Sequence, residues 1–203
     1  MAKIPDKRLV RIRRWYASGL SAWDIAQRMR VSLDAVYYFF RKHSIERRSP
    51  QANNAILFAR KKPSFKLKKK LSSKEQQLKI IGTMLYWAEG SQWPGEVIVD
   101  FANSNSEMIR LFMSFLRKIC GIEESKLRAY IYCYANQRPQ DLIRYWVHIT
   151  GIPASRFTKP YVRKDFKQEK MGKMIHGLIH IRYYDKKLLL LLRNWIVHYS
   201  SSF

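Results

Sequence analysis

The chain has 203 residues and a formal net charge of +24, because 39 Lys and Arg outnumber 15 Asp and Glu. This excess of positive charge makes a polyanion the expected partner. Hydrophobic residues make up 47% of the chain, which excludes general disorder, and no apolar run is as long as the roughly 18 residues of a membrane-spanning helix. Two cysteines exclude a disulfide framework, and MAKIPDKRLV lacks the apolar stretch of a secretory signal, so we expect a cytoplasmic protein, nucleoid-associated in a bacterium.

Residues 1–48 are predicted to form a small DNA-binding domain of three helices. Gly19 ends the first helix. Ser21 and Ser32 stand at the N-cap positions of the second and third helices, where a hydroxyl can accept a hydrogen bond from an unpaired backbone N–H. The spacing of these two helices is typical of a helix-turn-helix, whose last helix lies in the major groove.

The run GLSAWDIAQRM followed by VSLDAVYYFFRK resembles the helix-turn-helix of resolvases and transposases. One departure is Arg30, at a turn position where Gly is usual, so we expect the turn to differ, since a left-handed Arg costs about 1 kcal/mol. The basic arm IERRSPQ either follows the DNA backbone or is a solvated linker. The expected DNA contacts of this domain and its arm are Ser32, Asp34, Tyr37, Tyr38, Arg41, Lys42, Arg47 and Arg48.

Residues 49–73 are predicted to be a basic linker between two domains. The stretch ARKKPSFKLKKK at residues 59–70 has seven cations, Pro63 and little periodicity, which is typical of an extended segment. Charge is also uneven: residues 1–72 hold 19 cations and four acids, whereas residues 73–203 hold 20 cations and 11 acids.

Residues 74–203 alternate helical and strand patterns, which predicts an α+β fold for the whole chain. Ser104 or Ser106 is expected to cap the second helix of this region, and Gly121 to end it. Residues 154–175 are expected to be a loop or an extra strand. The predicted helices are 74–90, 107–120, 138–151 and 185–200, and the predicted strands are 96–103, 126–136 and 177–185.

The helix at residues 74–90 is mostly apolar and ends in Glu89. A carboxylate at a helix C-terminus is opposed by the helix dipole, and Gly90 lets the chain leave the helix sharply. If two such helices packed through the face of Gly82 in a homodimer, two Glu89 carboxylates would meet. Mg²⁺ or another divalent cation would relieve their repulsion and, beside a DNA backbone, could activate water.

The segment IIGTMLYWAEGS resembles the LAGLIDADG motif, with AEGS in place of ADGS. VDFANSNSEMIRLFMSFLRKICGI, YWVHITGIP and KMGKMIHGLIHIRYYD resemble later parts of compact bacterial LAGLIDADG-like proteins, so the similarity covers residues 75–199. The resemblance implies a saddle-shaped domain with strands on DNA, Glu89 as the catalytic metal-binding acid and the Gly90 carbonyl as a second metal ligand. Only one motif is present, Met84 and Trp87 replace smaller residues, and the first hairpin is short.

Other polar residues of this domain are candidates for chemistry. Glu96 and Asp100 are expected on one strand face, where they would complete a metal site with Glu89 or pair with cations. His176 and His180 are expected to share another strand face, as phosphate contacts, a general base or ordinary strand residues. The expected phosphate contacts of the sheet are Lys159, Arg163, Lys164, Lys173 and Arg182.

Three functions fit these patterns. The first is a sequence-specific, homodimeric protein that binds double-stranded DNA and cuts it as a divalent-metal-dependent endonuclease of the homing type. The second is a non-cleaving regulator of the WhiA type, and the third is an RNA-binding maturase, because the same fold is used for intron RNA. Glu89 favours cleavage, whereas the degenerate motif and short hairpin favour binding alone. No Walker loop, dinucleotide fingerprint or nucleophile signature is present, which argues against nucleotide hydrolysis and redox chemistry.

Overall fold

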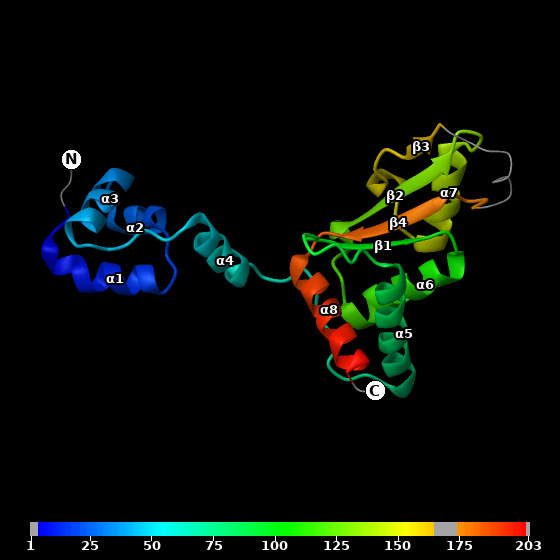
Figure 1. Ribbon diagram of the computed structural model, residues 1–203, viewed down its shortest axis with the longest axis horizontal. Helices are drawn as coiled ribbons and strands as arrows, with labels where there is room; N and C mark the ends of the chain where they lie inside the picture. The colour runs from blue at the N-terminus through cyan, green and yellow to red at the C-terminus, as the bar shows by residue number, and fades with distance from the viewer. Residues whose placement is uncertain (1–3, 165–173, 202–203) are drawn as a thin grey trace. The chain divides into compact units, whose positions relative to one another are not determined.

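The computed structural model describes residues 4–164 and 174–201. The chain divides into two compact units, Met1–Lys62 and Pro63–Phe203, called unit 1 and unit 2 below. The predicted α+β class is confirmed: the described residues form eight α-helices and one four-stranded sheet (Figure 1). None of the helices in the described ranges has the length and apolar character needed to cross a membrane.

Unit 1 consists of helices, and its three predicted N-terminal helices are present. Ser21 caps the second of them in a capping box with Asp24, and the Ser32 hydroxyl accepts a hydrogen bond from the backbone N–H of Ala35 at 3.2 Å. Apolar residues at helical spacing from the first three helices, among them Ile12, Ile25 and Phe39, form a buried core. The elements are a 3₁₀ turn at Asp6–Arg8 and helices α1 (Leu9–Ala17), α2 (Ala22–Met29), α3 (Leu33–Lys42) and α4 (Pro50–Arg60).

The turn between α2 and α3 keeps a left-handed residue at its first position. Arg30 has φ 54° and ψ 46°, so it takes the conformation that we expected an arginine to avoid. The left-handed conformation of Arg30 lets the next residue close the end of α2, because the backbone N–H of Val31 then donates to the Ala26 carbonyl at 3.1 Å. The closing hydrogen bond and the packing of Val31 offset a conformational cost of about 1 kcal/mol.

The segment expected as a basic linker, residues 49–73, is divided between the two units. Ser49 caps α4, and Pro50 occupies its first turn, where a missing N–H costs nothing. The guanidinium of Arg60 donates to the Ser18 carbonyl at 2.8 Å, which attaches α4 to the rest of unit 1. Residues 63–72 belong to unit 2, where Ser64 donates from its backbone N–H and its hydroxyl to the Asp185 carboxylate, both at 2.7 Å. The basic composition of this segment gives no indication of either the Arg60–Ser18 or the Ser64–Asp185 contact.

Unit 2 alternates helices and strands in the predicted order. A π-helical turn at Leu116–Cys120 continues α6, and the side chain of Asn105, rather than Ser104 or Ser106, caps that helix. An extra strand is present within residues 154–175. The elements are α5 (Ser73–Glu89), β1 (Val99–Asn103), α6 (Ser106–Phe115), β2 (Leu127–Tyr134), α7 (Pro139–Thr150), β3 (Tyr161–Arg163), β4 (Leu178–Tyr183) and α8 (Lys186–Ser200), with 3₁₀ turns at Glu124–Lys126 and Ala154–Arg156.

The sheet of unit 2 has the strand order β1-β4-β2-β3. β4 is antiparallel to both β1 and β2, and Ile181 lies opposite Phe101 on one side and Ala129 on the other. Side chains alternate between the two faces, so these three residues share a buried face that packs on the helices. Figure 1 shows α5, α6 and α8 below the sheet. The helices α5, α6, α7 and α8 all contribute to the core on that face. The opposite face carries Tyr130 and Arg182, which are only half-buried.

Candidate nucleic-acid interface

The outer face of α3 is polar and aromatic. Asp34 and Arg41 are exposed, and 53% of Tyr38 is accessible. Ser32 stands at the start of this face, although its hydroxyl oxygen is already used to cap the helix. Tyrosine and arginine side chains can reach base edges and phosphates from a helix in the major groove.

Tyr37 differs from the sequence expectation, because it faces partly inward. Its ring packs edge-on against the buried Phe40 at 6.5 Å between centroids, and the Arg47 guanidinium lies 4.3 Å from its ring centroid. Residues three apart on a helix share a face, so Tyr37 follows Phe40 toward the core. This contact also places Arg47 beside α3, while its side chain remains exposed.

Two other expected DNA contacts, Lys42 and Arg48, have structural roles. The Lys42 ammonium lies 2.7 Å from both carboxylate oxygens of Asp6. The Arg48 guanidinium donates to the carbonyls of Tyr16 and Leu20, each at 2.6 Å, and lies 3.8 Å from the Tyr16 ring centroid. The basic arm is therefore fastened to unit 1 through Arg48, so it is not a solvated linker at this residue.

The open face of the sheet in unit 2 carries a connected polar cluster, which we call the Asp100 cluster: Asp100, Tyr130, His180 and Arg182. One oxygen of Asp100 lies 2.8 Å from Nδ1 of His180, and the other accepts a hydrogen bond from Nε of Arg182 at 2.8 Å. The Arg182 guanidinium lies 4.8 Å from the Tyr130 ring centroid. The pairing of β1 with β4 creates this cluster by placing Asp100 opposite Arg182.

The electrostatics of the Asp100 cluster favour an ionised carboxylate. Burial acts to raise the pKa of Asp100, but the hydrogen bond from His180 and the charges of His180 and Arg182 outweigh it, so the pKa lies below the ordinary value. An ionised carboxylate only accepts hydrogen bonds, so His180 carries a proton on Nδ1. Its Nε2 is then available to accept a hydrogen bond or, in the charged ring, to donate one to a phosphate.

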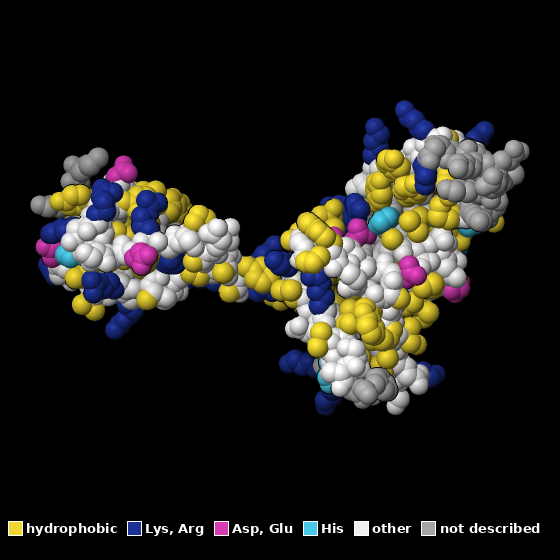
Figure 2. All heavy atoms as spheres, viewed as in Figure 1, with side chains coloured by type: hydrophobic (Ala, Val, Ile, Leu, Met, Phe, Trp, Pro, Cys, Tyr) yellow, Lys and Arg dark blue, Asp and Glu magenta, His cyan; other side chains and the backbone are white. Residues whose placement is uncertain are grey.

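A second basic area lies at β3, the edge strand beside β2. Tyr161 stacks on Tyr132 with ring centroids 5.1 Å apart, and Arg163 donates to the Tyr132 hydroxyl at 3.3 Å. Lys159 and Lys164 flank this strand and are exposed. Lys173, expected as a further phosphate contact, lies outside the described residues. Lys and Arg side chains project from the end of unit 2 that carries β3 (Figure 2).

Glu89 is exposed at the C-terminal end of α5. The next residue, Gly90, is extended with φ −81°, so its glycine character serves close approach rather than a left-handed turn. A Cβ at Gly90 would lie 2.4 Å from the Tyr86 carbonyl oxygen, and Gly90 forms a β-bridge to Phe101. Its own carbonyl oxygen, a predicted metal ligand, accepts a hydrogen bond from the Gln92 amide at 3.3 Å.

The three acids that were expected to share a metal site do not come together in one chain. Glu96 lies before β1 rather than in it, and its carboxylate accepts from the backbone N–H of Val97 at 2.9 Å and from the Ser91 hydroxyl at 3.2 Å. Asp100 is held by His180 and Arg182. Within the described ranges, no three His, Cys, Asp or Glu side chains form a group that could hold a metal ion.

Gly82 and His176 also lie elsewhere than their spacing in the sequence predicts. A Cβ at Gly82 would lie 2.2 Å from the Phe115 ring, so Gly82 packs against α6 of its own chain and does not face a second copy. His176 precedes β4, and its ring stacks on Tyr145 at 3.6 Å, away from the strand position that its spacing to His180 predicted.

An exposed apolar stripe on α5 was missed. Its members lie at helical spacing on the side that faces away from Phe115, and 48% of Trp87, 45% of Ile80 and 43% of Ile81 is accessible. The sequence contains a signal for this stripe, because its large apolar residues recur at helical spacing. We call Ile80, Ile81, Met84, Trp87 and Ala88 the α5 stripe.

No protein-family model, curated protein or solved structure matches this chain. The likeness to LAGLIDADG proteins and to the helix-turn-helix of resolvases therefore depends on the sequence motifs quoted above.

Proposed function

We propose that the protein is a sequence-specific double-stranded DNA-binding protein. The observation that carries this proposal is the α2–α3 pair: two capped helices joined by a tight turn, with Tyr38 and Arg41 on the open face of the second helix. A helix of this kind fits the major groove, where such side chains distinguish base pairs. Such a protein acts where the DNA is, in the cytoplasm and, in a bacterium, at the nucleoid.

The open sheet face of unit 2 supports a second contact with the same DNA. Arg182 and His180 lie on this face, and Lys159 and Lys164 border it at β3. Asp100 neutralises part of the Arg182 charge, so we assign the stronger phosphate contacts to the exposed lysines at the edge. In this arrangement, α3 provides most of the specificity and unit 2 adds affinity.

Selection from randomised duplex DNA, followed by binding measurements on selected and scrambled sequences, tests the assignment of α3. We expect Tyr38→Ala and Arg41→Ala each to weaken binding to the selected sequence by about 10- to 100-fold, since one base contact contributes roughly 1–3 kcal/mol. Binding to scrambled DNA should change much less. Arg14→Ala removes an exposed charge from α1 and serves as the control. Equal losses on both DNAs would show that α3 does not read sequence.

Metal-dependent endonuclease activity is a second candidate function. Its support is Glu89, an exposed carboxylate at the C-terminal end of α5. Glu89 follows Gly82 by seven residues and so lies on the side of α5 opposite the stripe. A dimer through the stripe therefore does not by itself bring two Glu89 carboxylates together. One chain offers one such carboxylate, and a metal site would need both copies. The resemblance of this helix to the LAGLIDADG motif supports the same role.

Incubation of the selected DNA with the protein and Mg²⁺ distinguishes cleavage from binding alone. We expect Glu89→Gln to abolish cleavage without weakening DNA binding, because it removes a negative charge near phosphates. Glu107→Gln, an exposed acid on α6, is the matched control and should cut normally. Intact DNA with the native protein would instead support the non-cleaving regulator. Preference for a structured RNA over every selected duplex would support the maturase.

A further inference from the structure

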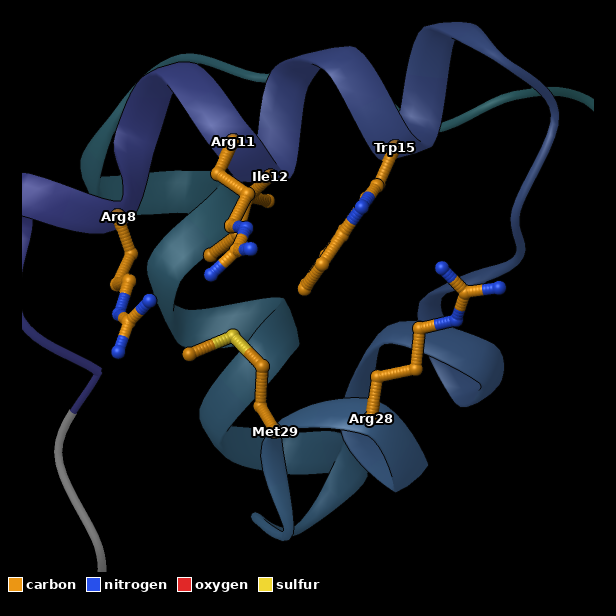
Figure 3. A pocket seen from close by; sticks show the side chains of 6 residues that line it. All are labelled: Arg8, Arg11, Ile12, Trp15, Arg28 and Met29. Carbon is orange, nitrogen blue, oxygen red and sulfur yellow. The ribbon is translucent and has the colours of Figure 1, made fainter.

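Unit 1 contains a cavity of about 210 Å³ beside α1 and α2 (Figure 3). Its lining comes from the first turn, α1 and α2, and no residue of α3 takes part. The cavity is therefore distinct from the α3 face that we assign to base recognition. Its lining residues are Arg8, Arg11, Ile12, Trp15, Arg28 and Met29.

The Trp15 ring organises the arginines of this cavity. The guanidinium carbons of Arg11 and Arg28 lie 5.1 and 5.5 Å from the ring centroid, and Figure 3 shows the ring between the two side chains. A cation over an indole face is attracted by the ring electrons. Both faces of Trp15 are thus occupied, and the guanidinium groups keep their N–H donors for another partner.

The positive charge of this cavity is not balanced by ion pairs. In the part of the chain that the structure describes, none of Arg8, Arg11 and Arg28 has a carboxylate within 4.0 Å. Arg28 acts on Asp24 only through a weak Coulomb interaction, because the Asp24 carboxylate is held by Ser21 at 2.8 Å. Three like charges line this cavity and repel each other, and a multivalent anion bound there would reduce that repulsion.

We propose that this cavity is a binding site for a phosphate group. Guanidinium groups match phosphate oxygens with paired N–H donors, which favours phosphate over a monovalent anion. Trp15 serves to position the arginines and does not stack on a base, since both of its faces are covered. The phosphate belongs either to a nucleic-acid backbone that passes along α1 and α2 or to a small phosphate compound.

The test uses the full chain and inorganic phosphate as the probe. Nitrogen-15 labelling of the six tryptophans gives six indole N–H signals, and Trp15→Phe identifies the one from Trp15. We expect phosphate to shift the Trp15 signal with saturation, whereas chloride at the same ionic strength does not. A Trp15 signal that responds equally to both anions would overturn the proposal.

Matched variants locate the phosphate. Arg11→Gln should weaken phosphate binding about tenfold, because one charge-assisted hydrogen bond is lost. Arg14→Gln removes the same charge from an exposed position of α1 outside the cavity and should leave phosphate affinity unchanged. Equal phosphate affinity in the two variants would also overturn the proposal. Far-ultraviolet circular dichroism of both variants verifies that unit 1 remains folded.

Competition then identifies the source of the phosphate. If the site binds a nucleic-acid backbone, oligonucleotides without a terminal phosphate should displace inorganic phosphate, and longer ones should do so more strongly. If it binds a small compound, only nucleotides and other free phosphate esters should displace it. Either result supports a phosphate site. Tyr38→Ala should retain phosphate binding, so a failure of α3 to read DNA and a failure of this cavity to bind phosphate give different results.

Discussion

At the scale of single residues, close packing explains Gly82, in the middle of α5, and Gly90, which follows the helix. Gly82 has no room for a Cβ because Phe115 occupies the space, and Gly90 has none because the Tyr86 carbonyl and ring do. Neither residue has a left-handed φ. Gly82 therefore belongs to the α5–α6 contact within one chain, which changes the outcome expected of a substitution there.

We expect Gly82→Ala to lower the free energy of unfolding of unit 2 by about 1–3 kcal/mol, because overpacking forces neighbouring side chains to shift. Denaturant unfolding, with unit 2 observed through its buried tryptophan fluorescence, measures this change. Gln77→Ala, at an exposed position of the same helix, should change it by no more than about 0.5 kcal/mol. Unchanged stability of Gly82→Ala would contradict the packing against Phe115.

Asp100 predicts a pH-dependent stability. Its pKa is lowered in the folded state, so its contribution to stability is complete above the ordinary aspartate pKa of about 3.9 and is lost as the pH falls through the lower, folded value. The native protein should thus be more stable than Asp100→Asn at pH 7, and the difference should shrink below about pH 4. Unfolding curves of both proteins across this range measure it. A difference independent of pH would mean that the ion pairs with His180 and Arg182 contribute nothing.

At the scale of elements, α5 uses two opposite sides. The side with Gly82 packs on α6, and the α5 stripe faces outward. A contiguous apolar stripe on a helix is more often an interface than a solvated surface. The dimer surface we propose is therefore the stripe, and not the Gly82 face predicted from the sequence.

Trp87→Glu tests this surface. We expect the substitution to weaken self-association at least about tenfold, since a buried aromatic contributes more than 1.4 kcal/mol to an interface. Sedimentation equilibrium of the full chain measures the association constant. Leu190→Glu places the same charge at an exposed apolar position of α8 and should leave the association constant unchanged. A native protein that stays monomeric on DNA would exclude the homodimer.

At the scale of the whole molecule, two basic units belong to one chain. The net charge of +24 is shared between them, and the covalent connection raises the effective concentration of one unit once the other has bound. Binding by both units should therefore release more counterions than binding by either alone.

We expect the logarithm of the DNA-binding constant to fall steeply with the logarithm of salt concentration, with a slope of about −0.9 per phosphate contacted. If Lys159 and Lys164 touch the same DNA as α3, replacing both with Gln should make the slope less negative by about two contacts. Fluorescence anisotropy at several salt concentrations measures the slopes. An equal slope for the native protein and the double variant would place these lysines outside the interface.

The sequence by itself determined the local elements, the α+β class and the positive charge. Ser21 and Ser32 start their helices because caps depend on neighbours a few residues away, and the alternation in β2 and β4 depends only on the next residues. The sequence also led to the correct end of α5 at Glu89. Ser49–Pro50 is a helix-start signal for α4, but the nearby cations led to the prediction of a linker there.

Only the tertiary structure decided which side chains are available to a partner. Asp100 meets His180 and Arg182 because β1 pairs with β4 some 80 residues later in the chain, and no local pattern sets that register. Arg48 is removed from the expected interface by carbonyls about 30 residues away. α5 has apolar residues on several sides, so its sequence does not show which side packs on the core. Gly82 faces inward because the Phe115 ring fits only where the helix has no side chain.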